Sequence, residues 1–143
     1  MKIIIREMTT EDAEPVNILS EQLGYLLSVE QTRQNINAIS QSKDHTAFIA
    51  QYENRIVGWI GASQTIMIEV TPHCEINGLV IDEHHRGIGI GKLLIDKVKQ
   101  WAKEKGNDKI GLHCNVKRTG AHLFYEHLGF TKAKQQTNFV ITI

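Results

Sequence analysis

A glycine-rich segment in the middle of the chain is the part of the sequence best suited to chemistry. Arg86-Gly87-Ile88-Gly89-Ile90-Gly91-Lys92 follows an apolar, strand-like run and opens a run with helical periodicity. The start of a helix presents unpaired N–H groups and the positive end of the helix dipole, so it attracts anions. Glycines let the backbone approach an anion closely, and Arg86 and Lys92 add positive charge. The segment therefore predicts a phosphate-binding site made largely of backbone.

The spacing within this segment excludes two familiar nucleotide-binding motifs. The phosphate-loop motif needs four residues between its first glycine and Gly-Lys, followed by a hydroxyl residue for magnesium. Here three residues separate Gly87 from Gly91, and Leu93 stands where Ser or Thr would be needed. The dinucleotide motif needs a third glycine at the position that Leu94 occupies. The phosphate ligand therefore belongs to another class.

The elements that must position this segment follow from periodicity and from turn residues. Apolar and β-branched runs predict strands at residues 3–7, 46–52, 55–68, 74–81, 109–114 and 139–143. Helical spacing and capping residues predict helices at about 10–23, 28–40, 90–105 and 119–128. The order indicates a mixed α/β fold with hairpins at the front and a crossover unit at the back. With 143 residues, we expect a single domain over residues 1–143.

Composition restricts the partners and the compartment. Sixteen basic and sixteen acidic residues give no basic excess, so we expect no nucleic-acid partner. No run of about 18 apolar residues is present, so we expect no membrane partner. Two cysteines, Cys74 and Cys114, lie in apolar runs and fit a reducing cytoplasm. The adjacent pairs of the seven histidines do not match metal-ligand spacing, so we expect no metal.

Several blocks of the sequence together resemble the GCN5-related N-acetyltransferase (GNAT) superfamily. Arg86, Gly89 and Gly91 match the family's Arg-x-x-Gly-x-Gly signature, and residues 75–81 resemble the strand that precedes it. Residues 121–130 resemble the family's Ala-x-x-x-Tyr-x-x-x-Gly-Phe block. The resemblance extends over essentially the whole chain.

The resemblance implies a fold and a cosubstrate. The family's fold has a central, mixed, mostly antiparallel sheet flanked by helices, with a parallel strand pair that splays apart. Acetyl-CoA would lie in that gap, where the backbone of Leu79, Val80 and Ile81 would pair with the pantetheine arm. The pyrophosphate would be held by Gly87, Ile88, Gly89, Ile90, Gly91 and Lys92, with Arg86 beside it. The family often has Asn seven residues before its helix tyrosine; Arg118 stands there in this chain and is a weaker cofactor candidate.

The same resemblance implies roles for two side chains in direct acetyl transfer. Tyr125 matches the tyrosine that protonates the departing sulfur, and Glu75 matches a position where family members place a general base. Without the resemblance, Tyr125 is equally a packing aromatic, and Glu75 an edge charge or a salt-bridge partner. A backbone N–H near Val80 would stabilise the oxyanion.

Three functions remain open for such a chain. The first is an enzyme that acetylates a primary amine of a small molecule; the Arg118 variant resembles members that act on such amines. The second is a protein or peptide N-acetyltransferase, and the third is a CoA-binding module without catalysis. The apolar tail Phe139–Ile143 further predicts a homodimer, because an exposed apolar strand edge tends to pair with another chain.

Overall fold

A five-stranded sheet organises the computed structural model, which describes residues 2–114 and 117–143. Neighbouring strands pair antiparallel except the last two, which are parallel. The order across the sheet is the order along the chain: β1 (Ile3–Glu7), β2 (His45–Tyr52), β3 (Arg55–Thr65), β4 (His73–Ile81) and β5 (Ile110–Leu112). The expected mixed, mostly antiparallel sheet is confirmed.

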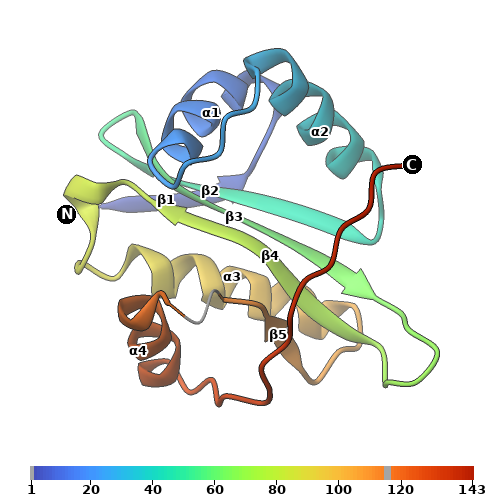
Figure 1. Ribbon diagram of the computed structural model, residues 1–143. Coiled ribbons are helices and arrows are strands. Elements are labelled where there is room, and N and C mark those ends of the chain that lie inside the picture. The colour runs from blue at the N-terminus through green and yellow to red at the C-terminus, as the bar shows by residue number, and fades with distance from the viewer. Residues whose placement is uncertain (1, 115–116) are drawn as a thin grey trace. The chain divides into compact units, whose positions relative to one another are not determined.

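Helices cover both faces of this sheet (Figure 1). On one face lie α1 (Ala13–Glu21) and α2 (Val29–Gln41), and on the other lies α3 (Ile90–Glu104). Each helix buries an apolar stripe, as helical spacing predicts. The stripe of α3 is the most completely buried, because Leu94, Ile95 and Val98 are at most 1% exposed. The core of α1 and α2 is built around Val16, Ile36 and the strand residue Ile49, among others.

The described chain falls into two units of unequal size. The first, Met1–Leu112, contains the sheet, the three helices named above and two short 3-10 turns, η1 (Thr10–Asp12) and η2 (Glu83–His85). The second, His113–Ile143, contains α4 (Thr119–His127) followed by residues without regular structure. A single domain over the whole chain therefore stays a prediction.

The expected final strand at residues 139–143 is wrong. Phe139, Val140, Ile141 and Ile143 are between 84% and 114% exposed, and this segment has no regular secondary structure. The sequence has the β-branched composition of a strand, but composition supplies no partner for the backbone N–H and C=O groups. A strand forms only where a neighbouring strand accepts and donates those hydrogen bonds.

The turn that begins α1 is fixed by a charged cluster. Asp12 is 5% exposed and accepts hydrogen bonds from both terminal nitrogens of Arg6, each at 2.8 Å. It also accepts from the backbone N–H of Thr9 at 2.8 Å, which is the capping arrangement expected before a helix. Burial by itself would raise the pKa of Asp12, but these hydrogen bonds outweigh it and the pKa is lowered.

One extra residue in β4 interrupts the sheet next to its parallel edge. Gly61 of β3 lies opposite Gly78, and the next residue, Ala62, lies opposite Ile76, so Asn77 has no partner in the register. Such a bulge bends a strand and increases its twist. The parallel pairing with β5 covers only Cys74 to Ile76, just before the bulge. Beyond it, β4 continues to Ile81 without β5 beside it.

Replacing Gly78 by alanine tests how tightly the sheet packs beyond the bulge. A Cβ on Gly78 would lie 2.7 Å and 2.9 Å from two ring carbons of Trp59, so the indole must move. We expect Gly78→Ala to lower the free energy of unfolding by about 1–3 kcal/mol in urea titrations. In β5, Gly111→Ala is the matched control, because its Cβ would make ordinary contacts at 3.9 Å and 4.0 Å. Equal stabilities of the two variants would contradict this packing.

Candidate active site

The open edge of β4 presents backbone groups in a fixed alternation. The N–H of Asp82 donates to the carbonyl of Val57 on β3 at 2.8 Å. Because a trans peptide points its N–H and C=O in opposite directions, the carbonyl of Ile81 faces away from β3. Arg86 Nε donates to that carbonyl at 3.3 Å. By strand alternation the backbone groups of Leu79 also face the open edge, and those of Val80 face β3.

The glycine segment continues directly from this strand and begins α3. Gly87 and Gly89 adopt left-handed conformations, with φ of 79° and 93°, which side-chain-bearing residues rarely adopt. Gly89 is the N-cap of α3 and brings no side chain to accept from the first N–H groups of the helix. The space where a Cβ of either glycine would lie is open. A fifteen-residue helix thus directs its positive end toward an uncovered backbone loop.

The charged side chains at the rim of this loop have partners within the protein. Arg86 is exposed and bonds Ile81, as described above. Lys92 forms an exposed ion pair with Asp96 at 2.8 Å, one turn along α3. Such exposed pairs contribute little to stability, so the ammonium can exchange Asp96 for another anion. The backbone geometry, more than these two side chains, would suit the loop to an anion.

A hydrogen-bonded anchor holds the start of the loop. Asp82 is 7% exposed; one carboxylate oxygen accepts from Gln22 Nε2 at 2.9 Å, and the other is 2.5 Å from His85 Nδ1. The amide oxygen of Gln22 accepts from the N–H of Glu83 at 3.0 Å. The bond from Gln22, assisted by that from His85, lowers the pKa of Asp82. The end of α1 thereby fixes the segment that leads into the glycines.

Glu75 lies on β4 before the bulge, beside a histidine. Its Oε1 is 3.0 Å from Nε2 of His73, and the two side chains are 25% and 17% exposed. Cys74 and Ile76, which alternate with them, are buried at 0% and 7% exposure. The carboxylate therefore stands on the less covered face of the strand, where a ligand can reach it.

The other two predicted side chains belong to the second unit. Tyr125 lies on α4, and its ring packs edge-to-face against Phe124 and Phe130, with centroids 5.3 Å and 5.8 Å apart. Burial raises the pKa of Tyr125, the nearby Cys114 adds to the rise, and Arg118 opposes it. The phenol is therefore protonated near neutral pH, as a proton donor must be. Arg118 itself is exposed and precedes α4 at its N-cap position.

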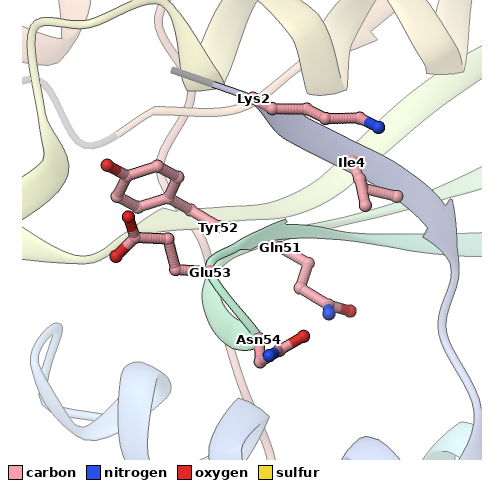
Figure 2. A pocket seen from close by; sticks show the side chains of 6 residues that line it. All are labelled: Lys2, Ile4, Gln51, Tyr52, Glu53 and Asn54. Atoms are coloured by element: carbon pink, nitrogen blue, oxygen red, sulfur yellow. The ribbon is translucent and has the colours of Figure 1, made fainter.

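A surface hollow of about 490 Å³ lies elsewhere in the first unit (Figure 2). Its lining comes from the start of the chain through β1, the end of β2 and the β2–β3 turn: Lys2, Ile4, Gln51, Tyr52, Glu53 and Asn54. None of the predicted site residues lines it. Within residues 2–114 and 117–143, no three His, Cys, Asp or Glu side chains are grouped to hold a metal ion. In the same ranges no helix is long and apolar enough to cross a membrane.

Comparison with known proteins assigns this arrangement to a family. The model of the acetyltransferase (GNAT) family matches residues 13–130. The chain belongs to the GNAT family. It is 32% identical over 133 residues to the uncharacterized N-acetyltransferase YhdJ of Bacillus subtilis, covering 90% of this chain and 92% of that protein. N-acetyltransferase 8B of Homo sapiens is 30% identical over 92 residues, which are 62% of this chain and 39% of the human protein.

Solved structures share the fold of this GNAT protein. The structure of AAC(6')-Iy in complex with the bisubstrate analog CoA-S-monomethyl-acetylneamine has a TM-score of 0.88 at 20% identity, with both chains covered completely. The expected fold is therefore confirmed. Together with the family match, the findings identify the chain as an acetyl-CoA-dependent acyltransferase.

Three features around the site of this GNAT protein were not anticipated from the sequence. Residues two apart on a strand share a face, so the spacing of His73 and Glu75 could have signalled their contact. The anchor of Asp82 joins residues 60 positions apart, and no local pattern signals such a contact. The bulge at Asn77 likewise depends on the register with β3.

Removing the Asp82 carboxylate tests the anchor. We expect Asp82→Ala to lower the free energy of unfolding at pH 7 by about 1–3 kcal/mol, because partners of a buried group lose their hydrogen bonds. Since the pKa of Asp82 lies below its ordinary 3.8, the carboxylate stabilises the fold above that pH, and the benefit is lost as pH falls through the lowered pKa. Urea titrations at several pH values measure both effects. Glu83→Ala, which removes only an exposed side chain, should change stability by less than about 0.5 kcal/mol.

Proposed function

We propose that this GNAT protein transfers the acetyl group of acetyl-CoA directly to a primary amine of a small molecule. The observation that carries the proposal is the open edge of β4, which leads into the uncovered glycine loop at the start of α3. A strand edge suits the amide-bearing pantetheine arm, and a helix start suits the pyrophosphate. Leu79 and Ile81 would offer backbone groups to the arm, with Val80 between them. Residues 86–92 would hold the phosphates.

The proposed acetyl transfer needs two proton transfers, one at the amine and one at the sulfur. As the C–N bond forms, Glu75 would accept the proton that the amine loses. As the C–S bond breaks, the phenol of Tyr125 would donate its proton to the sulfur. An N–H of the open edge, such as that of Leu79, would stabilise the negative charge on the carbonyl oxygen. The products are an amide and a free thiol.

Direct transfer is supported over an acetyl group bound to Cys74. Cys74, next to Glu75, is 0% exposed, and burial raises the pKa of its thiol to about 11. A buried, protonated thiol is a poor nucleophile. Two side chains suited to an acid and a base, in contrast, fit an enzyme rather than a binding module.

The amine is assigned to a small molecule on two grounds. Arg118 precedes α4 as in family members that act on small amines, and the aminoglycoside N-acetyltransferase AAC(6')-Iy shares the fold in its complex with the bisubstrate analog CoA-S-monomethyl-acetylneamine. An aminoglycoside and a set of simple primary amines are therefore the first acceptors to test. Acetylation only of peptides would replace this proposal by the protein N-acetyltransferase alternative.

The proposal also includes an assembly and a compartment: the protein forms a homodimer and works in the cytoplasm. The exposed apolar side chains of the tail, including Phe139 and Ile143, support self-association, because such surface is usually covered. The two free cysteines, Cys74 and Cys114, support a reducing compartment.

Calorimetry with acetyl-CoA tests the glycine loop. We expect Gly89→Glu to weaken binding at least about tenfold, because it places a carboxylate and a strained backbone where the pyrophosphate would lie. Gly106→Glu is a matched control, since Gly106 is also left-handed with open space around it, beyond the other end of α3. Equal affinity of the two variants would contradict a pyrophosphate site at the loop. No binding by folded wild-type protein would contradict the proposed function.

Tyr125→Phe tests the proposed acid. The substitution keeps the ring and its contacts with Phe124 and Phe130 but removes the donated proton. We expect kcat to fall by about 10²–10⁴-fold, with acetyl-CoA affinity and the unfolding midpoint nearly unchanged. Steady-state release of thiol measures kcat, and calorimetry measures the affinity. An unchanged kcat would remove Tyr125 from the mechanism.

A further inference from the structure

His73 is held by a hydrogen-bond partner at each of its ring nitrogens. Nε2 is 3.0 Å from Oε1 of Glu75, and Nδ1 is 3.1 Å from the backbone carbonyl of Thr71. A carbonyl only accepts, and so does an ionised carboxylate. The ring can satisfy both partners at once only when it carries a proton on each nitrogen. A neutral ring can donate to only one of the two.

The surroundings leave the pair partly open and nearly free of other charges. On β3, the residues opposite His73 and Glu75 are Thr65 and Ser63, which are uncharged. On β5, Gly111 passes beside both side chains, and even a Cβ there would stay 3.9 Å from His73 and 4.0 Å from Glu75. In the described part of the chain, the charged groups that act on His73 are Glu75 and Lys109, which lies just before β5.

We propose that His73 and Glu75 act together as the base of the proposed acetyl transfer, with His73 as a positioning residue that acts through the carboxylate. This inference rests on the proposed function. The proton that the amine loses reaches Glu75 and is then held between Oε1 and Nε2. The net charge of the pair changes from −1 to zero. The proton returns to solvent after transfer, and Tyr125 regains its own from solvent.

The electrostatics of the first unit agree with a shared proton. The bond from Glu75 raises the pKa of His73, the Thr71 carbonyl raises it further, and burial and Lys109 oppose the rise. The pair therefore gains its proton at a higher pH than an isolated histidine. An ion pair that merely stabilised β4 would require no link between this titration and turnover.

The pH dependence of kcat distinguishes the two roles. With saturating amine, wild-type kcat should fall as pH decreases through a midpoint above about 6.5, because the pair is then already protonated. We expect His73→Gln, which can still donate to Glu75, to lower kcat about tenfold or more and to move this midpoint down by about one pH unit or more. His45→Gln is the control, because His45 is exposed and contacts the hydroxyl of Ser42. An unchanged midpoint in His73→Gln would overturn the proposal.

A titration of the histidine side chains by ¹⁵N NMR tests the pair without any acceptor. The midpoint of His73 should lie above about 6.5 and should fall by about one pH unit or more in Glu75→Gln. A midpoint that Glu75→Gln leaves unchanged would overturn the proposal. The proposed function fails separately, if folded wild-type protein transfers acetyl to no amine while the His73 titration keeps its dependence on Glu75.

Discussion

The extra residue in β4 is the constraint on which the rest of the site depends. Because Asn77 has no partner on β3, β4 bends at that point, and its pairing with β5 ends at Ile76. The strand beyond keeps its hydrogen bonds to β3 on one side only. Its other side presents backbone groups that pair with no strand in the described residues and that lead into the glycine loop. A regular sheet would have used these groups internally and left nothing for a ligand to pair with.

The bulge also separates two kinds of chemistry along one strand. Before it, the side chains of His73 and Glu75 would exchange protons in the proposed mechanism; after it, the backbone groups of Leu79 and Ile81 would pair with amides of the cosubstrate. The first part acts through ionisable groups, and the second is independent of residue type. Arg86, which bonds the carbonyl of Ile81, stands where the strand gives way to the loop. In the proposed mechanism a single nine-residue strand would serve both recognition and proton transfer.

The sequence predicted best the features that depend on residues close together in the chain. The glycine loop and the start of α3 follow from a few adjacent residues, and the structure places them as expected. The family resemblance then supplied the mixed, mostly antiparallel sheet with one parallel pair of strands. The strand predicted at residues 139–143 failed because a strand depends on a partner outside its own sequence. The link between Gln22 and Asp82, and the register that leaves Asn77 unpaired, are long-range for the same reason.

The topology of the sheet also indicates which pair of strands should separate most easily. β2, β3 and β4 form a meander joined by short connections, whereas a whole helix, α3, separates β4 from β5 in the chain. Closing so long a loop costs conformational entropy. The three residues of β5 form few hydrogen bonds to offset that cost. Within the sheet, amide hydrogen exchange should therefore be fastest where β4 pairs with β5. The proposed site borders this pair of strands, so a bulky cosubstrate would be able to enter by local opening there while the meander stays folded.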